Sequence, residues 1–285
     1  MQQEAVDAVV ALLDLEPIEV NIFRGTSRDV EAQRVFGGQV AGQALVAAAR
    51  TVDHEPASFI HSLHAYFLRP GDPTVPILYE VDRIRDGRSF TTRRVVAIQH
   101  GRAIFNLQAS FHIHEGGGYD HQFPPPEVPP PDDLPNFAER WAPQKEQLGE
   151  YYTRPRPIDS RYVDWAPPDR QHPLPPHQRI WIRADGKLPD DPLVHACVLT
   201  YASDMTLLDT TLLPHGGTYL EGRVQMASLD HAMWFHRPFR ADEWLLYDHD
   251  TPTASDARGL ARGLIYAETG ELVASVVQEG LIRAQ

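Results

Sequence analysis

The stretch that decides the fold is VFGGQVAGQALVAAARTV, residues 35–52. Gly37 and Gly38 stand near its start, and small residues also occupy positions 41, 42, 44, 47, 48 and 49. The stretch predicts a thin helix, because glycine and alanine let neighbouring backbones approach closely. A helix of this kind is suited to pack against a sheet that surrounds it.

The segments on both sides of this helix predict further regular structure. Downstream, Arg-Pro-Gly-Asp, Asp-Gly and His-Gly turns separate four runs rich in β-branched and aromatic residues, at 59–68, 75–84, 89–100 and 103–112. Upstream, residues 18–23 form a strand-like run. Residues 5–15 repeat apolar side chains at helical spacing and predict a short helix packed by Val6, Val9, Val10 and Leu13.

A proline-rich stretch divides the chain. GGGYDHQFPPPEVPPPDDLP, residues 116–135, cannot form a regular core element and favours an extended linker. Residues 140–180 are polar and proline-punctuated, which indicates a connecting segment plus the first strand or strands of a second unit. We therefore expect an N-terminal unit at 1–118, a linker at 119–140 and a C-terminal unit at 141–285.

The second unit repeats the plan of the first. A helix is expected from about His195 to Leu213, ended by Pro214 and Gly216, and strands at 226–239, 243–251, 257–268 and 272–283. FLRP at 67–70 aligns with FHRP at 235–238, an offset of 168 (237 − 69) that also matches residues 64–66 with 232–234 and 104–111 with 272–279. Two such units can join edge to edge into one continuous sheet, which removes an exposed edge strand. The expected fold class is α+β.

Composition and charge exclude several classes of protein. The net charge is −13 and the pI about 5.5, so the surface as a whole repels nucleic acid. Cys197 is the only cysteine, so no disulfide can form within the chain, and a cytoplasmic location is expected. The N-terminus lacks a signal-peptide pattern, and no apolar run approaches the ~18 residues of a membrane span.

Long motifs in both halves make the chain similar to the acyl-CoA thioesterase II family of double hotdog enzymes. In the first half they are LDLEPIEVNIFRG (13–25), VFGGQVAGQAL (35–45), LHAYFLRPGD (63–72) and DGRSFTTRRVVAIQHGRAIF (86–105). In the second half they are YASDMTLL (201–208), SLDHAMWFHRPFRADEWLLY (228–247), ARGLARG (257–263) and VASVVQEGLIR (273–283). The resemblance implies two helix-plus-antiparallel-sheet repeats that form one continuous sheet, and a homo-oligomer that associates through the hotdog faces.

The resemblance also implies the catalytic residues. The family attributes catalysis to an aspartate at the start of the second helix, a serine or threonine on the next strand and a glutamine on the last strand. Here these are Asp204, Ser228 and Gln278. The implied reaction is hydrolysis of acyl-CoA to free fatty acid and CoA by a water that Asp204 activates and the other two residues hold, with no cofactor and no metal. The backbone N–H of Gly38, at a helix start, is a candidate oxyanion donor.

Each of these residues also has a structural interpretation. An aspartate near a helix start can cap the helix or complement its dipole, and Asp209 lies about one and a half turns further on. Ser228 alone is a serine in a strand. Gln278 stands in an apolar strand and is more informative, because a buried glutamine needs hydrogen-bond partners.

Other arrangements of residues predict less. A triad of Ser228, Asp230 and His231 is disfavoured, because alternate strand residues face opposite ways and no G-x-S-x-G elbow occurs. His112 and His114 share a strand face but have no further ligands nearby in the sequence. His236, with Asp230 and His231, is expected to be structural. CoA phosphates would require an arginine site, and the candidates are Arg83, Arg85, Arg88, Arg93, Arg94, Arg258 and Arg262.

Two alternative functions keep the fold. A hotdog enoyl-CoA hydratase would use an Asp/His pair in one segment, and no histidine lies within a turn of Asp204 on that face of the expected helix. A non-catalytic acyl-CoA-binding module has no need for a buried base. Free thiol released from acyl-CoA, followed together with enoyl absorbance, distinguishes the three.

Overall fold

One antiparallel sheet of thirteen strands organises the part of the chain that the computed structural model describes, residues 2–27, 33–53, 57–216 and 224–284. The strand order is β1-β2-β4-β5-β6-β3-β10-β13-β12-β11-β8-β7, and β9 pairs with β13. The strands are β1 (Glu16–Glu19), β2 (Ile22–Gly25), β3 (Ser58–Phe67), β4 (Ile77–Asp86), β5 (Phe90–Gln99), β6 (Arg102–Ile113), β7 (Ile158–Tyr162), β8 (His177–Ala184), β9 (Val224–Ser228), β10 (Asp230–Phe235), β11 (Leu245–Ser255), β12 (Arg258–Ala267) and β13 (Leu272–Ala284).

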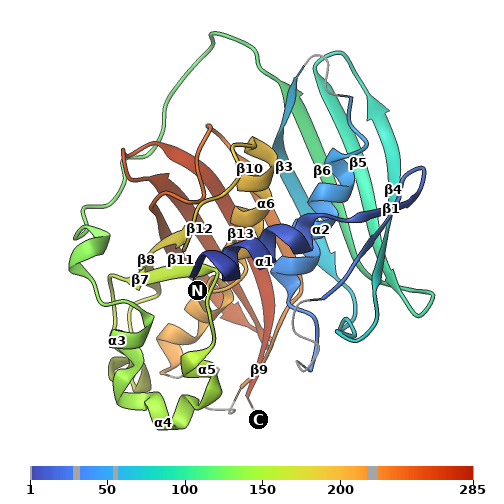
Figure 1. The fold of residues 1–285 in the computed structure, drawn as a ribbon. Coiled ribbons are helices and arrows are strands. Elements are labelled where there is room, and N and C mark those ends of the chain that lie inside the picture. The colour runs from blue at the N-terminus through green and yellow to red at the C-terminus, as the bar shows by residue number, and fades with distance from the viewer. Residues whose placement is uncertain (1, 28–32, 54–56, 217–223, 285) are drawn as a thin grey trace.

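Two helices lie side by side against this sheet, and a third crosses them (Figure 1). They are α2 (Gly37–Ala49), α6 (Pro192–Ser203) and the crossing α1 (Gln2–Leu13). A 3-10 helix, η4 (Leu208–His215), follows α6. Between the two units lie the short elements η1 (Pro131–Asp133), α3 (Phe137–Trp141), η2 (Ala142–Gln144), α4 (Lys145–Leu148), α5 (Glu150–Thr153) and η3 (Pro167–Gln171).

The thin helix expected from its small residues is confirmed. Every residue of α2 from Gly38 to Ala49 is buried. A Cβ at Gly42 would lie 3.3 Å from the carbonyl oxygen of Cys197 in α6, so the missing side chain lets the two helices pack closely. On α1, Val6, Val9 and Leu13 are buried as expected, and Val10 packs against the same core.

The seam between the two units is the antiparallel pair β3–β10. In its register His64 pairs with Ala232, and these two residues are related by the sequence offset of 168. On either side of it, Leu63 pairs with Met233 and Ala65 pairs with His231. The offset of 168 relates Leu63 to His231 and Ala65 to Met233, so it converts each of these pairs into the other. The repeat in the sequence is therefore a pseudo-two-fold axis in the structure, and it passes through the His64–Ala232 pair.

The last strand of each unit departs from this offset by one residue. In β6 the buried residues are 104, 105, 107, 109 and 111, and in β13 they are 273, 274, 276, 278 and 280. These two patterns coincide at an offset of 169 and not at the expected 168. Gln278 therefore takes the place that Ala109 has in the first unit.

Two strand predictions were wrong in their bounds. The run 18–23 is a tight hairpin, in which β1 and β2 pair Glu19 with Ile22 and Asn21 adopts a φ of 62°. Asparagine tolerates that left-handed conformation, so the chain can turn there. The run 226–239 is interrupted at Leu229, between β9 and β10, and ends at Phe235.

The second helix is also shorter than expected, because α6 ends at Ser203 instead of Leu213. Polar groups take over the hydrogen bonds of its last turn: Ser203 Oγ donates to the Thr200 carbonyl at 2.9 Å, and Tyr247 Oη donates to the Ser203 carbonyl at 3.3 Å. Such bonds compete with continued helix. The chain resumes as η4, which packs where Gly280 leaves room, since a Cβ there would lie 2.3 Å from Leu208.

The proline-rich segment runs across the outer side of the second unit. Residues 114–130 contain neither helix nor strand. Gln122 bonds to the Gly270 carbonyl at 2.8 Å and accepts from the Leu272 N–H at 3.0 Å, and Trp181 Nε1 donates to the Pro129 carbonyl at 3.0 Å. We propose the division into 1–118, 119–140 and 141–285 as the organisation of the chain, with this strap as the connection.

Separating the two units should destroy their solubility. Fragments 1–118 and 140–285 would each expose the seam edge of β3 or β10 and one face of a buried helix, so we expect each to aggregate when expressed alone. Co-expression should restore a soluble complex. Size exclusion and circular dichroism measure both outcomes, and soluble, folded and monomeric separate fragments would contradict the continuous sheet.

Candidate active site

Asp204 follows the end of α6, so the expected position at a helix start is wrong. It is the C-cap residue, directly after Ser203. A carboxylate at this position lies at the negative end of the helix dipole, where it is disfavoured. Neither N-capping nor dipole stabilisation by α6 therefore explains why an aspartate stands here.

Two side chains from the sheet hold the Asp204 carboxylate. Gln278 Nε2, on β13, donates to Oδ1 at 2.5 Å, and Ser228 Oγ, at the end of β9, donates to the same oxygen at 3.2 Å. Gln278 is fully buried, and its Oε1 has no hydrogen-bond partner among the described residues. Ser228 and Gln278, both named from the sequence, thus contact the same oxygen of Asp204, and the buried amide oxygen of Gln278 can accept a further hydrogen bond.

A break between β9 and β10 places Ser228. Ser228 pairs with Gly280 and Ala232 with Val277, so the register shifts by one residue across Leu229. Strand β3 has a shift at the corresponding place, between Ile60 and Ser62. Such bulges re-aim side chains and are common beside active sites. The first unit has the bulge too, but with Ile60 where the second unit has Ser228.

The start of the first unit's helix forms the opposite wall of the site. A Cβ at Gly37 would lie 2.7 Å from Asp204 Oδ2, and a Cβ at Gly38 would lie 2.5 Å from the Tyr201 carbonyl oxygen. The Gly38 N–H donates to the Asp204 carboxylate. Phe36 packs edge-to-face on Tyr201, with ring centroids 5.0 Å apart. The sequence VFGG therefore contacts the end of α6 that carries Asp204 in the other unit.

Burial changes the acidity of Asp204. It raises the pKa of this carboxyl from 3.8 to about 6, and the hydrogen bonds from Gln278, Ser228 and the Gly38 N–H oppose the rise. Part of the residue remains exposed, so solvent can reach it. A carboxylate with a pKa near 6 is ionised at neutral pH and is a stronger base than an ordinary aspartate.

Two more side chains from the sheet fix the turn that carries Asp204. His231 Nε2 lies 2.9 Å from Ser203 Oγ, and Tyr247 Oη bonds the Ser203 carbonyl. The hydroxyl proton of Ser203 is used on the Thr200 carbonyl, which assigns the donor N–H to His231 Nε2. Burial lowers the pKa of His231 to about 4, so the ring is neutral. This histidine is structural, as expected, and cannot act on Ser228.

The remaining residues singled out in the sequence lie in other contacts. Asp230 accepts the Glu279 N–H at 2.7 Å, and His236 bonds Ser275 Oγ at 2.8 Å. Asp209 pairs with Arg170 at 2.6 Å in a buried ion pair. His112 approaches Glu115 at 3.4 Å, and no three His, Cys, Asp or Glu side chains of the described chain lie together as metal ligands.

Four of the seven arginines considered for CoA phosphates already have acidic partners. Arg93 is fully buried and bonds Asp86 and Thr51. The exposed ones pair along the strands: Arg94 with Asp82, Arg258 with Glu279 and Arg262 with Asp250. These four are held by the fold, so a phosphate would have to displace a carboxylate.

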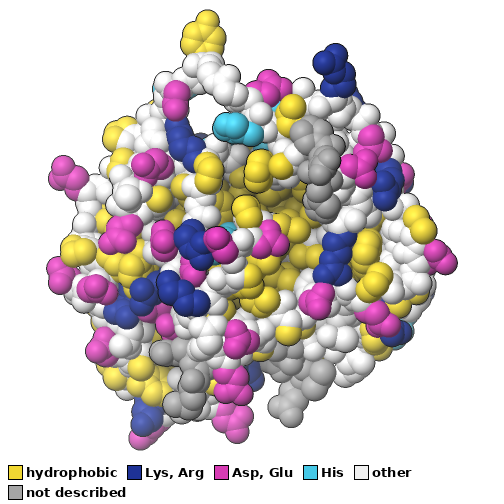
Figure 2. All heavy atoms as spheres, turned by 45° about the horizontal axis from the view of Figure 1, so that its top comes forward, with side chains coloured by type: hydrophobic (Ala, Val, Ile, Leu, Met, Phe, Trp, Pro, Cys, Tyr) yellow, Lys and Arg dark blue, Asp and Glu magenta, His cyan; other side chains and the backbone are white. Residues whose placement is uncertain are grey.

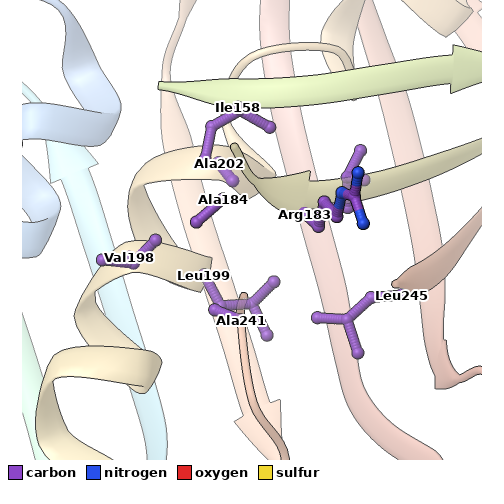
Figure 3. A pocket seen from close by; sticks show the side chains of 9 residues that line it. Ile158, Arg183, Ala184, Val198, Leu199, Ala202, Ala241 and Leu245 are labelled. Atoms are coloured by element: carbon purple, nitrogen blue, oxygen red, sulfur yellow. The ribbon is translucent and has the colours of Figure 1, made fainter. Parts of the chain in front are cut away.

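Two hollows of the described chain have none of the three residues in their linings. A small apolar cavity behind α6, between that helix and β7, β8 and β11, is lined by Val198, Leu199 and Ala202 on the helix side (Figure 3). A groove of about 590 Å³ between the β10–β11 connection and the β12–β13 hairpin includes Phe239 and Trp244. On the face at the top of Figure 1, hydrophobic side chains line a hollow with mixed charges around it (Figure 2).

Sequence analysis missed the residues that support the site from outside it. Tyr247 lies 168 positions after Tyr79, and both are buried with their hydroxyls bonded to a helix, Tyr79 to Gln43 Oε1 at 2.6 Å. Extending the repeat comparison along β4 and β11 would have found Tyr247. No comparable signal pointed to Phe36 or to the contact of Gly37 with Asp204.

Replacing Asp204 by asparagine should stabilise the protein while it removes the charge. Since the folded pKa lies above the unfolded value, the ionised carboxylate costs stability above about pH 6, and the cost vanishes below about pH 4. Two pKa units correspond to up to about 3 kcal/mol, or a rise in Tm of several degrees. The matched control Asp209→Asn should lower Tm, because it breaks the buried pair with Arg170. A lower Tm for Asp204→Asn at pH 8 would contradict this account.

The chain is similar to known acyl-CoA thioesterases in both of its halves. A family model described as acyl-CoA thioesterase matches residues 166–281, and one described as acyl-CoA thioesterase N-terminal domain matches residues 26–112. Acyl-coenzyme A thioesterase 8 of Mus musculus is 43% identical over 96% of this chain and 88% of its own length. Acyl-CoA thioesterase 2 of Haemophilus influenzae is 40% identical over 96% of both chains.

Solved structures agree with the fold. The acyl-CoA thioesterase II TesB2 from Mycobacterium marinum superposes with a TM-score of 0.80, at 48% identity over 97% of this chain and 98% of its own. A hot dog fold protein from Alicyclobacillus acidocaldarius has a TM-score of 0.77 at 19% identity, over 98% of both chains, and bears on the fold alone. The expected α+β architecture of two hotdog repeats in one sheet is confirmed. The chain belongs to the acyl-CoA thioesterase family, a family of thioester hydrolases, and has the double hotdog fold.

Proposed function

We propose that this protein hydrolyses acyl-CoA to a free fatty acid and CoA, with Asp204 as the general base for an attacking water and with Ser228 and Gln278 as the groups that fix the base and the water. The observation that carries the proposal is the contact of both side chains with one oxygen of Asp204, at 3.2 and 2.5 Å. Membership of the thioesterase family supplies the reaction class.

The geometry suggests how the water is held. Gln278 donates its N–H to Asp204, and its Oε1 is buried with no hydrogen-bond partner among the described residues. A water there donates one hydrogen to the carboxylate and the other to Oε1. Its lone pair is then free to attack the thioester carbonyl as Asp204 takes the first proton. Collapse of the tetrahedral intermediate breaks the C–S bond and releases CoA as thiolate, a leaving group that needs little acid assistance.

Gly38 is the proposed oxyanion donor, through its backbone N–H at the start of α2. The positive end of the α2 dipole favours negative charge at this place. In the unliganded arrangement this N–H donates to Asp204, so the thioester oxygen would have to share it with the base. Transfer of a proton to Asp204 during attack neutralises the carboxylate. Its hydrogen bond with the Gly38 N–H then weakens as the oxyanion forms.

The proposal extends to the assembly, the location and the partners of the protein. We propose a homo-oligomer that associates through the outer face of the sheet, where Phe59, Tyr66 and Phe90 are 47%, 58% and 42% exposed. We propose a cytoplasmic location, in keeping with a single, buried and unpaired Cys197. No helix of the described chain is long and apolar enough to cross a membrane. The net charge of −13 argues against a nucleic acid partner.

Single substitutions at the three residues should lower kcat. Asp204→Asn keeps the size of the side chain but removes the base, so kcat should fall by ~10²–10⁴ while acyl-CoA still binds. Ser228→Ala and Gln278→Ala should also reduce kcat. If the three act on one water, Asp204→Asn/Gln278→Ala should be scarcely worse than Asp204→Asn alone, because groups that act as a unit are strongly non-additive. Thiol release measures kcat and KM.

Asp209→Asn is the control for this series, since its carboxylate pairs with Arg170 and lies outside the Asp204 contacts. It should keep the wild-type kcat per folded molecule even where its stability falls. Multiplicative losses in the double variant would instead assign Gln278 to a separate step. A folded Asp204→Asn protein with near-normal kcat would reject Asp204 as the base.

A further inference from the structure

A cation from the first unit reaches the catalytic end of the second. Arg34 stands just before the VFGG segment, and its Nη2 donates to the Met226 carbonyl on β9 at 3.0 Å. Met226 lies two residues before Ser228 on that strand. Among the described residues Arg34 has no carboxylate partner, whereas Arg94, Arg258 and Arg262 are all paired.

Strand β9 has a neighbouring strand on only one of its two edges among the described residues. Its sheet partner is β13, and its opposite edge continues past the end of β3 at Phe67. The last hydrogen bond of the β3–β10 seam runs from the Phe67 N–H to the Leu229 carbonyl at 2.9 Å. Strand β9, which ends at Ser228, therefore lies just beyond the seam pairing. The guanidinium of Arg34 occupies this open edge by taking the carbonyl of Met226.

The charge of Arg34 also acts on Asp204, as the smallest of the effects on its pKa. Among the contacts of the described residues, Tyr247 on β11 and His231 on β10 are titratable side chains that bond Ser203, next to Asp204. Burial raises the pKa of Tyr247 above its usual range and lowers that of His231 to about 4, so both are neutral near pH 7. The contacts from α2, β9 and β13 are the uncharged Gly38, Ser228 and Gln278. The charge of Arg34 lowers the pKa of Asp204 against the effect of burial.

We propose that Arg34 is a positioning residue for the hydrolysis proposed above, on which this inference rests. It anchors the edge of β9 that faces away from β13, so that Ser228 stays on Asp204, and its positive charge favours the ionised form of that carboxylate. One residue of the first unit thereby contributes to both the geometry and the ionisation of the proposed base.

Three variants separate the parts of this role. Arg34→Met removes the donor and the charge, Arg34→Gln keeps a donor without the charge, and Arg34→Lys keeps the charge. Arg34→Met should lower kcat roughly tenfold and move the acidic limb of the kcat/KM profile to higher pH. Arg34→Gln should recover part of kcat, but the acidic limb of its kcat/KM profile should stay at the higher pH. Arg34→Lys should keep the acidic limb at the wild-type pH. High salt should move the wild-type limb toward that of Arg34→Met, because salt screens an exposed charge.

A second substrate excludes a role in CoA binding. Each variant is assayed with an acyl-CoA and with the matching N-acetylcysteamine thioester, which lacks the phosphates. The positioning role predicts the same relative loss of kcat with both. A rise in KM for acyl-CoA alone, with the limb in place, would make Arg34 a phosphate contact and overturn the proposal. Arg24→Met is the control, since Arg24 is an exposed arginine of the β1–β2 hairpin that pairs with Glu16 at 2.6 Å, and it should behave as wild type.

Parallel assay of Asp204→Asn keeps this test distinct from that of the function. Loss of activity in Asp204→Asn together with an unchanged Arg34→Met would reject the role of Arg34 alone. Wild-type activity in Asp204→Asn would reject the proposed base, whatever Arg34 does.

Discussion

The pairing of β3 with β10 about the His64–Ala232 pair is the constraint on which the rest of the molecule depends. It relates the two units by a pseudo-two-fold axis and sets α2 and α6 antiparallel against one sheet. The end of α6 then faces the start of α2, with Asp204 against Gly37 and Gly38. A carboxylate between two helix ends is opposed by one dipole and favoured by the other. Its burial raises its pKa toward neutral pH, and hydrogen bonds from Gln278, Ser228 and the Gly38 N–H oppose that rise.

The two units have different roles at this end of the molecule. The second supplies Asp204, Ser228 and Gln278, and the corresponding strand positions of the first hold Ile60 and Ala109. The first instead supplies a wall, in which Phe36, Gly37 and Gly38 contact the last turn of α6. Neither unit alone contains a complete set of contacts for the Asp204 carboxylate. The continuous sheet is therefore a requirement of the site.

The repeat and the thin helix could be predicted because each leaves a local pattern, whereas the three candidate residues were named from motifs shared with the thioesterase family. Small residues mark α2, a shared Arg-Pro marks the two seam strands, and a glutamine in an apolar strand marks Gln278. The end of α6 could not be predicted in this way, because Thr200 and Ser203 fit a helix locally and only Tyr247 and His231, distant in sequence, fix where it stops. The single-residue change from offset 168 to 169 is equally invisible, since it comes from strand register. The approach of Arg34 to β9 spans 192 residues and has no sequence signature.

The most direct measurement of this account is the titration of the Asp204 carboxyl itself. Protein labelled with ¹³C at the aspartate side-chain carboxyl carbons gives one resonance that disappears in Asp204→Asn, and its shift can be followed with pH by NMR. The account predicts a midpoint near 6, well above the ordinary 3.8, that coincides with the acidic limb of kcat/KM. A midpoint near 4, or a limb that does not follow the titration, would contradict a buried Asp204 as the base that activates the water.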